Sequence, residues 1–190
     1  MKLYLASSSN FKSKILDKVY LKHYRIDCNF KEDSSCTNVY EYVKDLSLGK
    51  AKSINANGII IGIDTVVFAD GRILEKPKSL EEAKNNLKIS AGKTTSVITG
   101  VTLINTSTNE VIQDYSETKV TLTDISDDDL DYYIKNEPGV MYASGFVIET
   151  IASNFIKKID GSFYNILGVP VEKIYEILLK WNIHLKDLEK

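Results

Sequence analysis

The chain has 190 residues, of which 43% are hydrophobic and 26% are charged, and its formal net charge is −2 at pH 7. This size and composition indicate a globular protein with a sizeable core. The near-neutral charge gives no global attraction to nucleic acid or to an anionic membrane, so we expect neither as a partner. No apolar run approaches the length of a membrane span or a signal peptide, and we expect a cytoplasmic protein.

The few cysteines and histidines exclude some classes of site. Cys28 and Cys36 have no histidine nearby at metal-ligand spacing and are predicted to be reduced thiols. His23 and His184 lie far apart in the sequence, so neither a zinc site nor a Ser-His-Asp triad is indicated.

The first part of the chain alternates predicted strands and helices. Residues 3–6 form a short apolar run that predicts a strand, and Ser9 is a suitable N-cap for the helix that follows. A second strand is predicted over residues 23–30. Apolar residues recur at helical spacing over residues 38–54, which predicts a second helix.

The stretch NGIIIGIDTVVFADGRILEKP carries the strongest β signal. Asp64 separates two apolar runs within it, at the point where a buried strand is expected to emerge, and Asp70-Gly71 predicts a hairpin turn. Ser79, with Glu82 three residues later, matches the capping-box pattern at the start of a helix.

The rest of the chain predicts a mixture of hairpins and helices. The expected elements are two β-rich runs at 94–104 and 111–123, a helix starting at Ser126, short strands after Pro138-Gly139, a turn at Asp160-Gly161 and a helix over 171–181. Helices alternate with strands, but long hairpins also occur. We therefore predict a single α/β domain over residues 1–190, with a mixed central sheet flanked by helices.

The opening segment LYLASSSNFKSKIL is a candidate phosphate site. A strand that ends in small hydroxyls and enters a helix presents backbone N–H groups and a positive dipole end to an anion. Ser7 and Ser9 add hydroxyl groups, and Lys12 lies one turn into the helix. The alternative interpretation is an ordinary strand-to-helix connection with a serine N-cap.

Two further stretches contain candidate chemical groups. Asp64 in GIDT places a carboxylate in an apolar run, which is costly unless the group is paired, bound to metal or used as a base; the alternative is a turn aspartate. Lys76 in LEKPK precedes Pro77 at a predicted strand end, where it is either a phosphate ligand or a solvated charge. By contrast, AGKTT is not the end of a P-loop, because Leu87 stands where that motif needs glycine.

Taken together, the motifs resemble those of the Maf family of nucleoside triphosphate pyrophosphatases over nearly the whole chain. The family pattern runs LASxSPRR, DE, EKA, GxDT, GEILxKP, GxxHxVxTGV, KAGxYxIQ and GSYxNVVGLP. Here the corresponding stretches are LASSSNFK, KE, GKA, GIDT, GRILEKP, GKTTSVITGV, YASGFVIE and GSFYNILGVP. Each stretch alone is a weak signal, but eight in the same order are specific.

The resemblance implies an enzyme that cuts between the α- and β-phosphates of a nucleoside triphosphate with the help of Mg²⁺ or Mn²⁺. It also implies an elongated two-lobed fold with a cleft between the lobes, and a homodimer. Asp64 would be the proton acceptor and, with Glu32, would hold the metal. The residues implied in binding the triphosphate are Ser7, Ser9, Lys12, Lys50 and Lys76.

This chain departs from the family pattern in places. Lys12 replaces the second arginine of PRR, which keeps the charge but loses the bidentate fork that suits phosphate. Asn10 replaces the proline, and Tyr142 replaces the lysine of KAG.

Three positions resemble those that set base specificity in the family, namely Phe11, Thr65 and Glu149. Members acting on dTTP and UTP carry arginine, threonine and glutamine there, whereas members acting on 7-methyl-GTP carry an aromatic residue, glutamine and glutamate. A carboxylate at residue 149 can accept two hydrogen bonds from guanine, and an aromatic residue 11 can stack on a cationic purine. The matches favour a modified guanine such as 7-methyl-GTP, with dTTP and UTP as the alternative.

Two further readings stay open. One is a non-catalytic nucleotide-binding regulator, since the family is also linked to septum formation. The other is a hydrolase of inosine-type purine triphosphates, which a similarly folded family handles. The presence of Asp64, Glu32 and Lys76 favours an enzyme, and the LASSS and GIDT stretches favour Maf over the second family.

Overall fold

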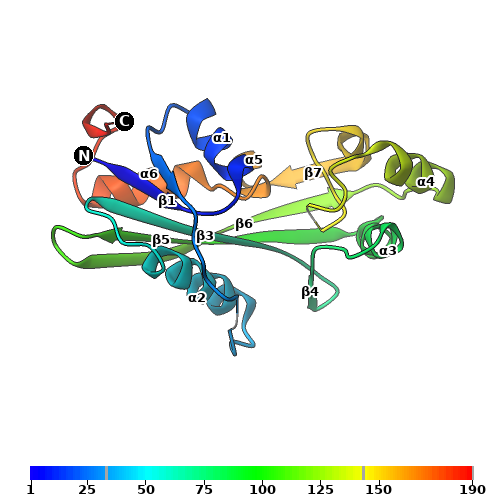
Figure 1. Cartoon of the computed structure of the whole chain (residues 1–190). Helices are drawn as coiled ribbons and strands as arrows, with labels where there is room; N and C mark the ends of the chain where they lie inside the picture. The colour runs from blue at the N-terminus through cyan, green and yellow to red at the C-terminus, as the bar shows by residue number, and fades with distance from the viewer. Residues whose placement is uncertain (33, 143, 190) are drawn as a thin grey trace. The chain divides into compact units, whose positions relative to one another are not determined.

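The computed structural model describes residues 1–32, 34–142 and 144–189 and has an α/β fold (Figure 1). Its seven-stranded sheet has the order β2-β1-β3-β5-β6-β7, with β4 paired to β3. The strands are β1 (Leu3–Ala6), β2 (Tyr24–Ile26), β3 (Ile59–Ala69), β4 (Arg72–Leu74), β5 (Thr94–Asn105), β6 (Glu110–Leu122) and β7 (Ile156–Asp160). The α-helices are α1 (Asn10–Lys18), α2 (Val39–Lys52), α3 (Leu80–Ser90), α4 (Asp127–Asn136), α5 (Phe163–Ile166) and α6 (Val171–Lys180).

The sheet is mixed, as predicted. Strand β1 pairs in parallel with both β2 and β3, whereas the β3-β4 and β6-β7 pairs are antiparallel. The parallel part follows from the helical crossovers in the first 60 or so residues, and the antiparallel β3-β4 pair is a tight hairpin. The antiparallel strands β6 and β7 are joined by a longer connection that contains α4. The prediction of an α/β fold with a mixed sheet is confirmed.

The chain divides into two compact units. Unit 1 contains Met1–Thr65, Ile98–Ser116 and Leu167–Lys190, and unit 2 contains Val66–Val97 and Glu117–Ile166. Strands β3, β5 and β6 each contribute residues to both units. The elongated shape and the cleft implied by the family resemblance stay predictions.

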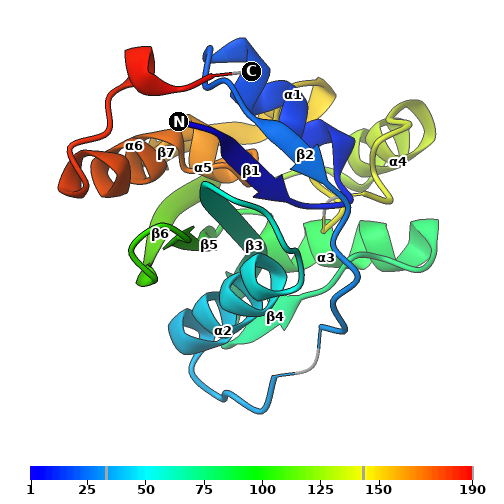
Figure 2. The ribbon, with the colours of Figure 1, turned by 60° about the vertical axis from the view of Figure 1, so that its left-hand side comes forward.

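In unit 1, helix α2 lies on one face of the sheet, while α1 and α6 lie on the other (Figures 1 and 2). The backbone of α2 comes unusually close to two strands. A Cβ at Gly62 of β3 would lie 2.0 Å from the Ser47 carbonyl oxygen, and one at Gly100 of β5 would lie 2.1 Å from the Val43 carbonyl oxygen. Only glycine therefore allows the helix to pack this closely.

Unit 2 has its own core between α3 and α4. Tyr133 of α4 is fully buried there, together with Ala83 and Leu87 of α3. The Tyr133 hydroxyl accepts a hydrogen bond from the Val147 backbone N–H (2.9 Å). Burial raises the pKa of Tyr133 to about 12, so the hydroxyl stays protonated well above its ordinary range.

Side-chain caps start the helices where the sequence predicts them. Ser9, Ser79 and Ser126 each accept a hydrogen bond from the backbone three residues later. The capping box at Ser79 is shifted by one residue, because the Glu82 carboxylate accepts from the backbone N–H of Lys78 (2.6 Å) rather than from that of Ser79.

Two expectations of local structure need correction. Strand β3 runs through Asp64 to Ala69, so the alternative interpretation of Asp64 as a turn residue is wrong. Of the short strands predicted after Gly139, β7 is present, whereas the described residues before it form turns and a 3₁₀ helix, Ile151–Phe155. The buried Glu137 carboxylate accepts from the Gly139 N–H and the Thr150 hydroxyl, so side-chain bonds replace a strand ladder.

Among the residues that the structure describes, no helix is both long enough and apolar enough to cross a membrane. Cys28 and Cys36 are free thiols, as predicted.

Candidate active site

The turn between β1 and α1 holds the serines of the opening segment. The Ser7 hydroxyl accepts from the Ser9 N–H (3.1 Å), and the Ser9 hydroxyl accepts from the Lys12 N–H (3.4 Å). Arg25 of β2 donates to the carbonyl oxygens of Ser7 (3.3 Å) and Ser8 (3.1 Å). The guanidinium thus fastens the turn from the neighbouring strand, and the serine N-cap predicted as an alternative is present.

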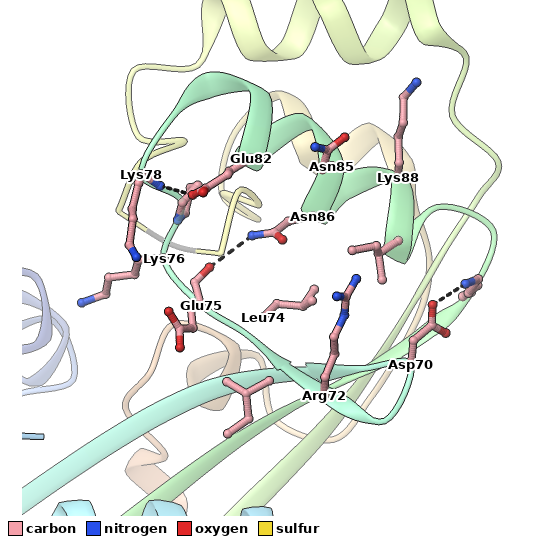
Figure 3. A pocket seen from close by; sticks show the side chains of 14 residues that line it. Asp70, Arg72, Leu74, Glu75, Lys76, Lys78, Glu82, Asn85, Asn86 and Lys88 are labelled. Atoms are coloured by element: carbon pink, nitrogen blue, oxygen red, sulfur yellow. Dashed lines mark hydrogen bonds and ion pairs between the residues drawn. The ribbon is translucent and has the colours of Figure 1, made fainter. Parts of the chain in front are cut away.

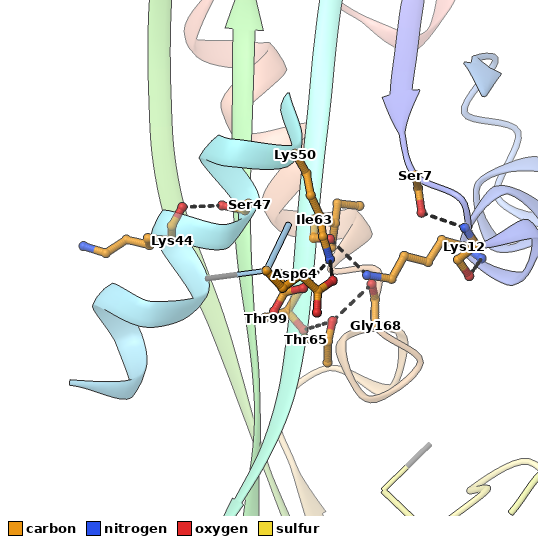
Figure 4. A network of polar contacts seen from close by, with 12 residues as sticks. Ser7, Lys12, Lys44, Ser47, Lys50, Ile63, Asp64, Thr65, Thr99 and Gly168 are labelled. Carbon is orange, nitrogen blue, oxygen red and sulfur yellow. Dashed lines mark hydrogen bonds and ion pairs between the residues drawn. The ribbon is translucent and has the colours of Figure 1, made fainter. Parts of the chain in front are cut away.

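A lysine joins the two predicted catalytic carboxylates. Lys50 Nζ, near the end of α2, lies 2.5 Å from an Asp64 carboxylate oxygen (Figure 4). The same atom lies 2.7 Å from a Glu32 carboxylate oxygen. The Asp64 side chain is 9% exposed, whereas that of Glu32 is 54% exposed. Within the described part of the chain, Lys50 is the one cation paired with Asp64.

The environment of Lys50 keeps its ammonium charged. Burial disfavours the charge, but the attraction and hydrogen bond of Asp64, followed by those of Glu32, outweigh it and raise the pKa of Lys50 above its ordinary value of 10.5. The site therefore combines one ammonium group with two carboxyl groups. Such a site can bind a further cation, or can bind an anion through the lysine.

The residues on either side of Asp64 in β3 are also held in place (Figure 4). Lys12 Nζ donates to the Ile63 carbonyl oxygen (3.1 Å), so this side chain spans from α1 to β3. The Thr65 hydroxyl lies 3.1 Å from the Thr99 hydroxyl and 3.5 Å from the Gly168 carbonyl oxygen. The stretch GIDT is therefore the meeting point of α1, α2, β5 and the turn before α6.

Gly168 is suited to that turn in two ways. Its φ is +79°, a left-handed conformation that favours glycine. A Cβ here would lie 3.1 Å from Thr65 Oγ1 and 3.5 Å from Lys12 Cε. The glycine thus lets the turn approach two predicted substrate-binding residues.

Phe11, on α1, has 46% of its surface exposed and is therefore not a core residue of its helix. Its exposed ring can therefore contact a ligand. Unit 1 brings together eight of the predicted site residues, namely Ser7, Ser9, Phe11, Lys12, Glu32, Lys50, Asp64 and Thr65.

Lys76 and Glu149, the other two predicted site residues, belong to unit 2 and are both exposed. Lys76 follows β4 and lies at the edge of a pocket of about 780 Å³ between the β3-β4 hairpin and α3 (Figure 3). Arg72, Lys78 and Lys88 also line this pocket, so it is rich in cationic groups. The roles of Lys76 and Glu149 beside the Asp64 site stay predictions.

The structure adds three residues that the sequence did not single out. Arg25 fastens the serine turn, Thr99 contacts the Thr65 hydroxyl, and Gly168 admits the turn beside Lys12. Gly168 lies within a recognised motif, so a signal existed for it. Thr99 also lies within a recognised motif, GKTTSVITGV. Nothing in the local pattern around Arg25 points to a site, because its contacts are with a turn that is distant in the sequence.

Two carboxylates of the site are candidate ligands of the implied divalent cation. Within residues 1–32, 34–142 and 144–189, no three His, Cys, Asp or Glu side chains form a cluster that could hold a metal by themselves. Mg²⁺, however, is commonly bound by one or two carboxylates together with substrate phosphates and waters. Glu32 and Asp64, which both reach the same ammonium group, fit that donor set.

The chain matches one protein family over nearly its whole length. The family described as "Maf-like protein" matches residues 2–181. A dTTP/UTP pyrophosphatase of Clostridium perfringens (strain SM101) is 35% identical over 189 residues, which cover 96% of this chain and 98% of the relative. Proteins with the same name from Thermoanaerobacter sp. (strain X514) and Clostridium beijerinckii are 34% and 37% identical, over 94% and 92% of this chain and 95% and 96% of theirs. The chain therefore belongs to the Maf family.

Proposed function

We propose that this protein is a nucleoside triphosphate pyrophosphatase that hydrolyses the α–β phosphoanhydride and prefers dTTP and UTP. The observation that carries the chemistry is the pair of carboxylates, Asp64 and Glu32, on the single ammonium of Lys50. Hydrolysis of a phosphoanhydride needs a group that accepts a proton from water and positive charge that stabilises the phosphoryl oxygens. This site supplies both.

Asp64 is the better placed of the two carboxylates to act as the base. Its burial keeps bulk water away, whereas Glu32 is largely exposed. When water attacks the anhydride, its proton passes to an Asp64 oxygen, and the bridging oxygen leaves with pyrophosphate. Lys50 holds the carboxylate in position through the short contact to one of its oxygens.

Glu32 and Asp64 would hold the divalent cation. A bound Mg²⁺ or Mn²⁺ supplies neutralisation of the charge that develops on the phosphate oxygens. Ser7, Ser9, Lys12, Lys50 and Lys76 are the proposed ligands of the triphosphate. Binding phosphate requires a turn with a fixed backbone conformation. Arg25 meets this requirement, because it donates hydrogen bonds to the backbone of the serine turn.

The base preference rests on the relatives. The three proteins described above are named dTTP/UTP pyrophosphatases and are aligned with this chain over nearly its full length. Thr65 matches the pyrimidine group of the family, and its hydroxyl is held by Thr99 and the Gly168 carbonyl. The expected preference for 7-methyl-GTP is not supported by these relatives, whose names favour the alternative.

The test is a comparison of kcat/KM for dTTP, UTP and 7-methyl-GTP. The released pyrophosphate is cleaved to phosphate, and the phosphate is measured with a colorimetric assay. We expect dTTP and UTP to exceed 7-methyl-GTP by at least tenfold. Glu149→Gln, which installs the glutamine of the pyrimidine group, should raise kcat/KM for UTP and leave the fold unchanged. Equal or higher activity on 7-methyl-GTP, lowered by the same variant, would instead establish the second candidate.

That second candidate has one observation in its favour. Phe11 and Glu149 are the aromatic and acidic residues of the methylguanine group, and both are exposed. An exposed aromatic ring can stack on a cationic purine. Phe11→Arg separates the two candidates, because it should raise activity on UTP if the pocket takes a pyrimidine and abolish activity on 7-methyl-GTP if it takes a methylated purine.

A further inference from the structure

The segment between β2 and α2 carries Glu32 but belongs to neither element (Figure 2). Side-chain contacts of its described residues therefore contribute to its position. One such contact is evident. The ring of Phe30, two residues before Glu32, rests against Gly49 of α2, one residue before Lys50.

The contact requires glycine. A Cβ at residue 49 would lie 2.1 Å from Phe30 Cζ and 2.3 Å from Cε2. Non-bonded carbon atoms are separated by about 3.5–4.0 Å at their optimal distance, so no side chain fits between the helix backbone and this ring. The edge of the ring fills the space that the first atom of any other residue would occupy.

Glycine at this position does not favour the helix. In a helix interior it is less favourable than alanine by roughly 0.8–1.0 kcal/mol. The family motif stretch reads EKA where this chain reads GKA, so this chain has glycine where the family pattern has a residue with a long side chain.

The Phe30–Gly49 contact lies close to the Glu32–Lys50 ion pair in the sequence, both in the segment before α2 and in α2 itself. Glu32 pairs with Lys50 at 2.7 Å, and Phe30 meets Gly49 beside it. The Glu32 side chain is 54% exposed, so burial does little to fix it. Phe30, by contrast, is half-buried and packs against α2.

We propose that Phe30 and Gly49 are positioning residues that hold Glu32 against Lys50. The proposal rests on the function proposed above, in which Glu32 takes part in metal binding. If it is correct, a side chain at residue 49 displaces the segment that carries Glu32, while the intrinsic helix propensity of α2 rises.

A double-mutant cycle tests this inference. Gly49→Ala should lower kcat/KM by about 10–100-fold, the range seen when a partner that orients a metal ligand is removed. Glu32→Gln should lower it at least as far. In the double variant the two effects should not add, because Gly49 acts only through Glu32. Asp45→Ala, an exposed position one turn earlier in α2, is the matched control and should behave as wild type.

A second readout does not depend on activity. Trypsin should cleave the free protein after Lys31 several times faster in Gly49→Ala than in wild type or Asp45→Ala, with an unchanged or higher melting temperature. Phe30→Ala should give the same faster cleavage. It also keeps the test valid if Gly49→Ala does not fold.

The outcomes separate the two proposals. Wild-type activity of Glu32→Gln would overturn the role of Glu32, and this inference with it. If Glu32→Gln is impaired but Gly49→Ala is active and resists trypsin like the control, the positioning role alone is wrong. Full additivity of the two substitutions would also overturn it.

Discussion

Replacing Asp64 with asparagine separates the chemical role of this carboxylate from its structural role. The two side chains are nearly isosteric, but the amide cannot accept a proton from water. General-base catalysis is typically worth about 10²–10⁴-fold in rate. We therefore expect kcat for the preferred triphosphate to fall by at least about 100-fold.

The effect on stability should be much smaller, because Lys50 does not lose all its partners. Removing one member of a buried ion pair costs about 3–5 kcal/mol when the other charge is left uncompensated. In Asp64→Asn the lysine keeps Glu32 at 2.7 Å, and the amide oxygen can still accept its hydrogen bond. We expect a loss of about 1–2 kcal/mol. For a chain of this length that corresponds to a fall in Tm of roughly 2–8 °C.

Removing the lysine instead of the aspartate should have a larger effect on stability. Lys50→Met leaves two carboxylates near each other without their counter-charge, and we expect it to cost about 3–5 kcal/mol of stability. The assay for both variants is kcat by pyrophosphate release together with Tm by differential scanning fluorimetry. An Asp64→Asn enzyme that keeps more than a tenth of the wild-type kcat would refute the assignment of Asp64 as the base. If Asp64→Asn unfolds near room temperature, the view that Glu32 compensates the charge of Lys50 in this variant is refuted.

Three further predictions concern other parts of the structure. Lys12→Ala should raise KM and reduce its dependence on salt, whereas Lys12→Arg should restore or improve binding through its bidentate fork; unchanged kinetics in the alanine variant would contradict a role of Lys12 in binding the triphosphate. Gly168→Ala should destabilise unit 1 by about 1–2 kcal/mol, because alanine is strained at φ +79°, and thermal unfolding measures this. Tyr133→Phe should be less stable than wild type at pH 7 because the Val147 N–H loses its acceptor. The unfolded tyrosine ionises near pH 10 but the folded one only at about 12, so this difference should shrink over that range in urea unfolding measured at each pH.

Local chemistry made much of the fold predictable from the sequence. Helix starts at Ser9, Ser79 and Ser126 depend on contacts within three residues, and the structure has all of them. The stretch after Gly139 was not predictable in this way. There the buried carboxylate of Glu137 binds two groups of the following turn, and an apolar pattern read as strands does not register such side-chain bonds.

The candidate site shows the same division. Asp64 could be singled out because a carboxylate in an apolar run needs a partner, but the sequence does not say which cation supplies it. That cation is Lys50, and its choice depends on how α2 packs on β3. The contacts of Arg25 and Thr99 likewise arise from strand order, which no local pattern encodes.

The close approach of α2 to Gly62 and Gly100 has a consequence for large-scale mutagenesis. In a screen of all single substitutions scored by enzyme activity, both positions should reject every other residue, since even alanine would overlap a helix carbonyl oxygen. Their scores would match that of Asp64, although neither glycine touches a reacting atom. Measuring protein abundance beside activity distinguishes them, because the glycine variants should be lost from the soluble fraction while Asp64→Asn accumulates as an inactive protein. The positions most sensitive to substitution in this chain will therefore include the glycines on which α2 packs as well as the catalytic groups.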